Sequence, residues 1–430
     1  MRALAAVAFA LGACTGTTGT ITLDLATAPD SHLLDAVQRL RVTITDPRQV
    51  VEATRTASGF DLALEVDATA TNGALSVEGF DAAGALIACG QSPRFPVAAI
   101  NAHVVVYVAA PRSIAVSPAK VSAARGGVAA APISLGAVLA GGIETTGAPS
   151  TATAVYNAFD HSLVEGIPLP APRVGPAMAT DASGGVYMFG GTGPGGQPAG
   201  TLWRFDTTVP PNGAFAMITD QPGYARTGEL IVPVGAGTYL ITGTPALELS
   251  AGMLTARSDV TGGLPAAGAT AVPGDGMPTA IFAGDAVVRF RGNAFAALSG
   301  DHPVAGAAAV TLPDGRIAVI GGTASRDVLV VDAAAGSVAV IPGVLSTARI
   351  HPAVAATSRH VVVTGGLTPA GDPIAAADVL DARTLAPVVT LPLVTGSGGF
   401  AIALPNDQVL IGGGSPALPM YELFTPEPPP

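Results

Sequence analysis

Cysteine, lysine and aromatic residues are scarce in this chain of 430 residues, which has two cysteines, one tryptophan and a single lysine, Lys120. Two cysteines cannot form the disulfide framework of a small secreted scaffold. Only 12% of the residues are charged, whereas 49% are hydrophobic. This composition excludes a disordered chain and a coiled coil, because both are rich in charged residues.

Basic residues are also in deficit, and the formal net charge is −11 at pH 7. Nucleic acids and anionic lipid surfaces repel a chain of this charge. The sequence therefore predicts no nucleic-acid partner and no electrostatic binding to a membrane.

Glycine and proline are abundant, with 54 and 37 residues respectively. They punctuate many short apolar runs, which is typical of short strands joined by tight turns. The length allows more than one structural unit. We therefore expect an all-β protein built from at least two units.

Residues 1–13 begin with a short basic start and an apolar run too brief to span a bilayer, which predicts a secretory signal. The run ends in Leu-Gly-Ala-Cys, which resembles the lipobox of bacterial lipoproteins. The resemblance implies that Cys14 receives the lipid and that residues 14–20 form a tether. The alternative is an ordinary signal with an incidental cysteine. Thr15, in place of an aspartate, implies an outer-membrane lipoprotein on the periplasmic or cell-surface side.

Residues 21–111 contain about seven short alternating runs, which predict a small β-sandwich. Residues 75–90 read as a strand, an Asp-x-x-Gly turn and a second strand. This arrangement resembles immunoglobulin-like and transthyretin-like accessory domains. Cys89 lies in this unit and has no partner once Cys14 is lipidated, so we expect a buried free thiol.

A repeated unit begins at about residue 125 and recurs every forty to fifty residues or so. Each copy has an arginine-containing turn, a strand of small residues, a turn, and an apolar strand ending in glycine. Two degenerate copies end at Gly243 and Gly284. The other five end in glycine pairs: Gly141-Gly142, Gly190-Gly191, Gly321-Gly322, Gly365-Gly366 and Gly412-Gly413.

The strand after each glycine carries an aromatic or aliphatic residue followed by aspartate, as at Phe205-Asp206 and Leu380-Asp381. Together with the glycine pairs, this pattern resembles kelch repeats. The resemblance implies a seven-bladed kelch-like β-propeller over residues 113–425.

The two ends of this region are expected to share a sheet. Residues 113–118 (SIAVSP) match residues 337–342 (SVAVIP), the fourth strand of a complete copy. We therefore predict that 113–118 is a closing strand for the last blade. Residues 426–430 (PEPPP) cannot continue a sheet because proline has no amide donor, so we predict a disordered tail.

Four repeat arginines lie sixteen or seventeen residues before the glycine position of their copies: Arg125, Arg173, Arg226 and Arg349. Equivalent positions in a closed ring meet around its axis on one face. Each arginine either binds carbonyls of its own or a neighbouring blade, or contributes to an axial site for an anionic group or a partner side chain.

The motifs of common catalytic and metal sites are missing from the sequence. The six histidines lack metal-ligand spacing, and no Gly-x-Ser-x-Gly elbow leads into a helix. Copper-dependent kelch oxidases need a crosslinkable cysteine, and the propeller region has none. We therefore expect structural histidines, no catalytic residues, no metal and no cofactor.

These observations favour a non-enzymatic, envelope-anchored lipoprotein whose propeller is a protein-binding or scaffolding module. The expected partner is another envelope protein or a glycan, and the expected state is a monomer. A propeller enzyme or a carbohydrate-binding protein acting on an extracellular substrate is the alternative. The single tryptophan, Trp203, is expected to pack between blades.

Overall fold

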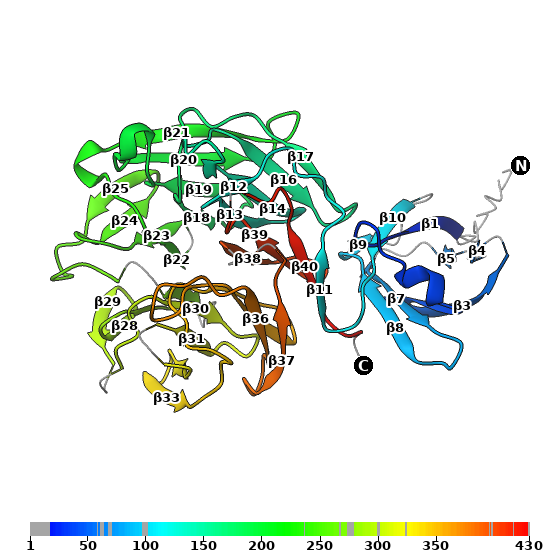
Figure 1. The fold of residues 1–430 in the computed structure, drawn as a ribbon. Helices are drawn as coiled ribbons and strands as arrows, with labels where there is room; N and C mark the ends of the chain where they lie inside the picture. Colours follow the sequence, from blue (N-terminus) through cyan, green and yellow to red (C-terminus); the bar gives the residue numbers. More distant parts are fainter. Residues whose placement is uncertain are drawn as a thin grey trace, which may run out of the picture.

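The computed structural model describes residues 18–57, 59–60, 64–67, 71–96, 102–235, 237–265, 268–272, 279–298, 302–322, 325–394, 396, 399–415 and 417–428. In these residues the fold is all-β, and the helical elements are three short 3-10 helices. Figure 1 shows a smaller part, residues 18–107, beside a larger part that starts at residue 113. The C-terminus lies between the two parts.

The smaller part contains a five-stranded sheet of order β4-β3-β2-β7-β8, a three-stranded sheet of order β10-β1-β5 and the pair β6-β9. Its elements are β1 (Thr18–Ala26), η1 (Leu33–Ala36), β2 (Arg39–Thr45), β3 (Arg48–Thr56), β4 (Gly59–Phe60), β5 (Leu64–Asp67), β6 (Asn72–Gly73), β7 (Leu75–Phe80), β8 (Leu86–Gln91), β9 (Phe95–Pro96) and β10 (Ala102–Tyr107). Every second residue of β2 is buried, as expected for a strand with one face on a core. Leu40 and Val42 from β2 share a cluster with Ile21 and Val106 from the other sheet, so the two sheets share one core.

The larger part contains, in the described residues, seven antiparallel sheets of four strands. The strands of each sheet are β13 (Ala129–Ile133), β14 (Gly136–Ala140), β16 (Thr153–Asn157) and β17 (Ser162–Glu165); β18 (Ala177–Thr180), β19 (Val186–Phe189), β20 (Thr201–Asp206) and β21 (Ala214–Asp220); β22 (Ile231–Gly235), β23 (Thr238–Ile241), β24 (Leu247–Ser250) and β25 (Met253–Ala256); β26 (Ala269–Val272), β27 (Thr279–Ala283), β28 (Val287–Arg291) and β29 (Ala294–Ala297); β30 (Ala307–Thr311), β31 (Ile317–Gly321), β32 (Val328–Asp332) and β33 (Ser337–Ile341); β34 (Ala353–Ala356), β35 (His360–Thr364), β36 (Ala376–Asp381) and β37 (Pro387–Pro392); and β38 (Phe400–Ala403), β39 (Val409–Gly412), β40 (Glu422–Thr425) and β11 (Ser113–Val116). The short strands β12 (Arg125–Gly126) and β15 (Ile143–Glu144) pair with each other, and η2 (Pro194–Gly196) and η3 (Pro222–Tyr224) lie in loops.

The first strands of these sheets contact one another in the order β13, β18, β22, β26, β30, β34 and β38, and β38 contacts β13. The second strands β14, β31 and β35 are buried along their whole length. Both faces of a second strand are therefore covered by the neighbouring sheets, which explains its continuous apolar sequence. The ring of sheets makes this an all-β, propeller-like protein.

The strand β11 joins the beginning of the larger part to its end. It pairs antiparallel with β40, with Ser113 opposite Thr425 and Val116 opposite Glu422. This is the pairing that the match between residues 113–118 and 337–342 predicts.

The glycine pairs allow neighbouring sheets to approach closely. Gly141 and Gly142 both have positive φ, and a Cβ on Gly141 would lie 2.3 Å from the carbonyl oxygen of Arg173. The amide of Gly142 donates a hydrogen bond to that same oxygen. A side chain at Gly141 would therefore push the next repeat away from the ring.

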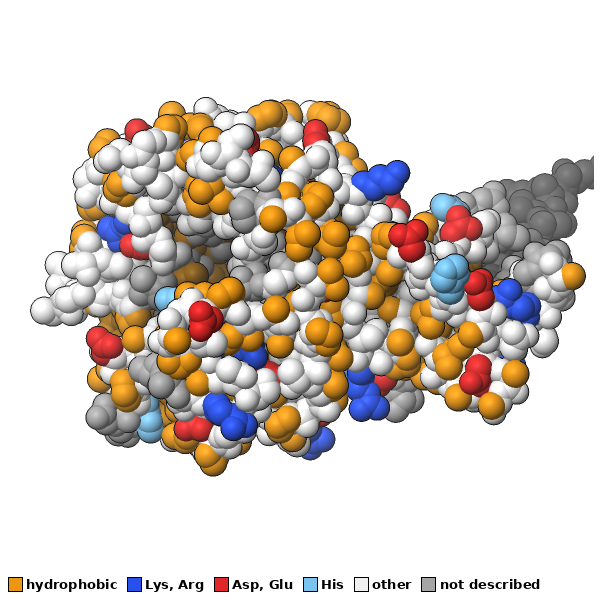
Figure 2. Space-filling model, viewed as in Figure 1, with side chains coloured by type: hydrophobic (Ala, Val, Ile, Leu, Met, Phe, Trp, Pro, Cys, Tyr) orange, Lys and Arg blue, Asp and Glu red, His pale blue; other side chains and the backbone are white. Residues whose placement is uncertain are grey.

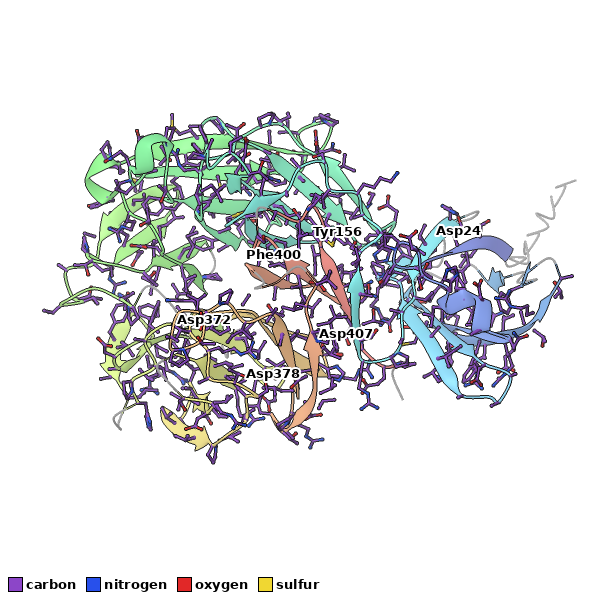
Figure 3. All side chains as sticks on the ribbon, in the orientation of Figure 1. Asp24, Tyr156, Asp372, Asp378, Phe400 and Asp407 are labelled. Atoms are coloured by element: carbon purple, nitrogen blue, oxygen red, sulfur yellow. The ribbon has the colours of Figure 1, made fainter. Side chains whose placement is uncertain are left out.

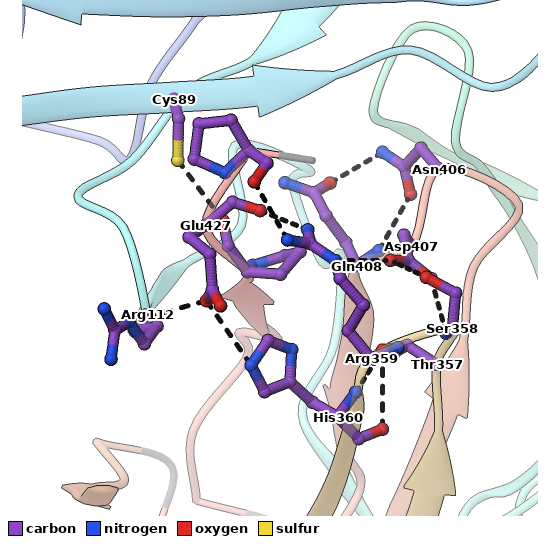
Figure 4. Close-up of polar contacts among 12 residues, drawn as sticks. Cys89, Arg112, Thr357, Ser358, Arg359, His360, Asn406, Asp407, Gln408 and Glu427 are labelled. Atoms are coloured by element: carbon purple, nitrogen blue, oxygen red, sulfur yellow. Dashed lines mark hydrogen bonds and ion pairs between the residues drawn. The ribbon is translucent and has the colours of Figure 1, made fainter. Parts of the chain in front are cut away.

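The prediction of a disordered C-terminal tail is wrong for residues 426–428. Figure 4 shows this tail held between the two parts. The Cys89 thiol donates to the carbonyl of Pro426 at 3.2 Å, and the Arg359 guanidinium donates to the carbonyls of Glu427 and Pro428. Proline cannot donate to a ladder, but its carbonyl still accepts hydrogen bonds. Residues 429–430 lie outside the described residues.

The strand directions divide the ring into two faces. Loops between second and third strands, and connections from one sheet to the next, lie at one edge; we term this edge the arginine face, because it carries the repeat arginines. Turns between first and second strands lie at the opposite edge, the turn face. Asp407 lies in such a turn, near the smaller part (Figure 3). The smaller part and the tail therefore contact the turn face.

Candidate functional site

All four repeat arginines are buried: their exposed fractions are 9% for Arg125, 6% for Arg173, 8% for Arg226 and 0% for Arg349. Buried guanidinium groups are paired because an unpaired buried charge is costly. The structure therefore does not bring these side chains together as an exposed axial ring.

Three of the arginines cross-link loops of their own sheet. Arg125 donates to the carbonyls of Gly141 and Ala152, sixteen and twenty-seven residues downstream. Arg226 donates to the carbonyl of Thr242 at 2.9 Å, and Arg349 donates to that of Gly365 at 3.0 Å. The spacing between the arginine and the glycine position is constant in these copies because the arginine donates to the carbonyl that ends the second strand.

Arg349 additionally forms an ion pair inside the ring. Its Nη2 lies 2.7 Å from Asp378 Oδ2, and both side chains are almost fully buried. Asp378 also accepts hydrogen bonds from the Ser346 amide and the Thr390 hydroxyl. Burial lowers the pKa of Arg349, and the charge of Asp378 opposes this shift. Asp378 lies within the lower group of sheets in Figure 3.

Arg173 departs from this pattern. Its Nη1 donates to the carbonyl of Pro172 at 2.8 Å, and its Nη2 donates to the Thr201 hydroxyl at 2.7 Å. The guanidinium carbon lies 4.6 Å from the centre of the Trp203 ring. Trp203 is 2% exposed and belongs to the core between the first two sheets, which confirms that it packs between sheets.

Arg173 also lines a cavity of about 290 Å³ on the arginine face. Around it lie the loop after β19, the beginning of β20 and the segment after β21. The other lining residues are Gly193, Pro194, Gln197, Pro198, Ala199, Gly200, Thr201, Asp220, Pro222 and Ala225.

A larger cleft of about 470 Å³ lies on the same face, between the degenerate third and fourth copies, the fifth copy and the beginning of the sixth. Its polar side chains are Asp285 and His351, both exposed. The remaining lining residues are Gly262, Gly263, Leu264, Pro265, Ala283, Gly284, Ala286, Val288, Ala305 and Gly306.

His351 has a backbone conformation that favours glycine, with φ at +52°. The residue two positions after the repeat arginine is a glycine in three other copies, Gly127, Gly175 and Gly228, and all three have positive φ. A side chain in this region costs about 1–2 kcal/mol. His351 keeps this unfavourable backbone conformation at the edge of the cleft, which makes it a candidate functional residue.

Four of the other histidines pair within the structure. His32 lies 3.1 Å from Asp35 and His103 lies 2.7 Å from Asp24, both on the surface. His161 is buried beside Tyr156, and His360 contacts Glu427. In the described part of the chain, no group of three His, Cys, Asp or Glu side chains is arranged to hold a metal ion.

Cys89 is buried and free, as expected from the sequence. Burial raises the pKa of its thiol to about 12, so it is protonated at neutral pH. A protonated, buried thiol is a poor nucleophile. Cys14, the expected lipidation site, lies outside the described residues.

The charged groups on the face seen in Figure 2 are scattered among apolar and uncharged polar side chains. No protein-family model matches this sequence, and comparison with curated proteins finds no match. Within the described ranges, no helix has the length and apolar character needed to cross a membrane.

Proposed function

We propose that the larger part is a seven-bladed kelch-like β-propeller and that the smaller part is an immunoglobulin-like or transthyretin-like β-sandwich. The seven four-stranded sheets, the glycine pairs and the completion of the last sheet by β11 support the first assignment. The core shared by the two sheets of the smaller part supports the second.

We further propose an outer-membrane lipoprotein anchored through Cys14. Metabolic labelling with an alkyne fatty acid tests this anchor, followed by separation of membrane and soluble fractions. The intact protein should carry the label and sediment with membranes, and Cys14→Ser should lose both properties. A label that persists on Cys14→Ser would rule the anchor out.

The propeller is proposed to act as a non-enzymatic binding module for another envelope protein. The cleft of about 470 Å³ with Asp285 and the strained His351 carries this proposal. Asp285 is the acidic residue of the cleft lining, and the whole chain has a net charge of −11. A basic side chain of the partner therefore fits the cleft best.

A photo-crosslinking amino acid at Ala286, inside the cleft, tests this function in intact cells. The matched control carries the same amino acid at Ala182, an exposed residue of a turn on the opposite face. A discrete protein adduct should form from Ala286 only, and Asp285→Asn should reduce it at least fivefold. Equal adducts from both positions, or none from Ala286, would refute the proposal.

The variant His351→Gly separates binding from folding. Removing the side chain relieves the positive-φ strain, so the free energy of unfolding should rise by about 1 kcal/mol. The Ala286 adduct should nevertheless weaken. A variant that is destabilised and still forms the full adduct would assign His351 a purely structural role.

A further inference from the structure

Arg173 holds hydrogen-bond donors that its surroundings do not use. A guanidinium has five N–H donors, and the acceptors recorded for Arg173 are the carbonyl of Pro172 and the hydroxyl of Thr201. Its Nε is buried and has no hydrogen-bond partner in the described structure. The side chain is only 6% exposed, and it still lines the cavity.

The difference from the other repeat arginines has a local cause. In three copies the guanidinium is held by the main-chain carbonyl that ends the second strand. In the second copy the side chain instead stacks on Trp203 and bonds to Thr201. Arg173 therefore does not donate to the carbonyl that ends the second strand, and its remaining N–H donors stay available.

The cavity is shaped to receive a small group. Pro194, Pro198 and Pro222 form part of its wall, and proline restricts backbone motion. At Gly193, an added Cβ would lie 3.4 Å from Arg173 Nη1. The missing side chain keeps the space beside the guanidinium open.

We propose that this cavity binds a carboxylate group, with the Arg173 guanidinium as its anchor. Guanidinium and carboxylate match in geometry and charge. Asp220 lines the same cavity, and its negative charge disfavours a dianion such as phosphate. A volume of about 290 Å³ is small for a ligand pocket and suits a short organic acid or one acidic side chain. This site is separate from the Asp285 cleft, so it does not depend on the proposed protein partner.

Trp203 makes the site directly observable, because it is the single tryptophan of the chain and stacks on Arg173. Propionate represents a free acid, and N-acetylglutamic acid α-amide represents an acidic side chain. Each is titrated at constant ionic strength, with Trp203 fluorescence and isothermal titration calorimetry read in parallel. At least one probe should bind saturably, whereas propionamide and N-acetylglutamine amide should not.

Arg173→Gln should weaken the binding of that probe at least tenfold, whereas Arg226→Gln, the matched change in the next copy, should leave it within twofold. Gly193→Val narrows the cavity without removing a hydrogen bond of Arg173, so it should block binding in a protein with a normal circular dichroism spectrum. Binding of propionate alone would identify a free acid as the ligand, and binding of the glutamate probe alone would identify an acidic side chain. No saturable binding by the intact protein, or full binding by Gly193→Val, would overturn the proposal.

Discussion

Arg349 and Asp378 form an ion pair that water hardly reaches, in the middle of an apolar ring of sheets. Such a pair offsets its desolvation cost only when the remaining polar atoms are also satisfied. The carbonyls of Gly365 and Ala376 accept from Arg349 Nη1, and the Thr390 hydroxyl donates to Asp378, whereas Arg349 Nε has no partner in the described structure. The network locks the loop before β34 onto the strand β36.

Removal of one partner should therefore be costly. Asp378→Asn leaves the Arg349 charge buried without a counterion and should lower the free energy of unfolding by about 3–5 kcal/mol. Urea denaturation followed by Trp203 fluorescence measures this change. Arg316→Gln is the control: its pair with Asp314 is more than one-third exposed, so the loss should be below about 1 kcal/mol. Similar losses in both variants would contradict the argument.

His161 is a second buried polar residue with a defined state. Its Nε2 accepts a hydrogen bond from the Tyr107 amide at 3.3 Å, so the proton of the neutral ring lies on Nδ1 and is donated to Tyr156 Oη at 2.9 Å. Burial lowers the pKa of His161 from 6.5 to about 4. Protonation would remove the acceptor that links Tyr107 to the larger part.

This shift predicts a pH-dependent stability. The unfolded chain binds a proton at His161 below about pH 6.5, while the folded chain binds it only below about pH 4. Stability should therefore fall as the pH falls through this window, by about 2 kcal/mol between pH 7 and pH 5. Urea midpoints of the intact protein and of His161→Gln at both pH values measure the difference. An equal pH dependence in the two proteins would show that other groups cause it.

Among the elements, β11 has the largest consequence for the ring. It lies more than three hundred residues from its partner β40 in the sequence, yet it supplies the fourth strand of the last sheet. A ring closed by strands from both ends of its sequence cannot open without breaking a sheet. Closure therefore couples all the sheets into one unfolding unit.

Deletion of residues 113–118 should make unfolding non-cooperative, because β40 is then left as an unpaired edge. Differential scanning calorimetry should show a broadened or split transition at a lower temperature. The control replaces residues 120–122, between β11 and β12, with Gly-Gly-Ser and should keep a single sharp transition. A single transition in the deletion variant would show that closure does not depend on β11.

In the whole molecule, the two parts meet around the tail segment 426–428. Arg112 and His360 both lie near the Glu427 carboxylate, at 3.5 and 3.3 Å, while Arg359 lies 3.9 Å from Asp407 (Figure 4). Cys89, from the smaller part, is covered by the same tail. The tail therefore acts as a connector that both parts share.

Thiol labelling of Cys89 reports on this junction, in a Cys14→Ser background that leaves one cysteine. The buried thiol, with its pKa raised to about 12, should react with a thiol reagent at least tenfold more slowly than free cysteine. Ending the chain after Thr425 should accelerate labelling at least tenfold. Ending the chain after Pro428 keeps every contact described above, so the labelling rate of Cys89 should not change. An unchanged rate after the shorter truncation would mean that the tail does not cover Cys89.

Features that depend on local pattern could be predicted from the amino-acid sequence. Apolar strands of fixed spacing, the glycine pairs and the match between residues 113–118 and 337–342 indicate repeated sheets and their closure, because each copy must satisfy the same packing. The unpaired Cys89 was likewise predictable as a buried thiol.

The identity of the atypical arginine and the positions of the clefts could be found only in the folded protein. Arg173 and Trp203 are thirty residues apart, and Asp285 and His351 come from different sheets. Their roles depend on side-chain contacts between loops. Equivalent positions of the repeat look alike in the sequence, so the pattern does not reveal which contacts differ. The same reason explains the error over residues 426–428, since a proline-rich segment gains order only from the carbonyl acceptors that it offers to Cys89 and Arg359.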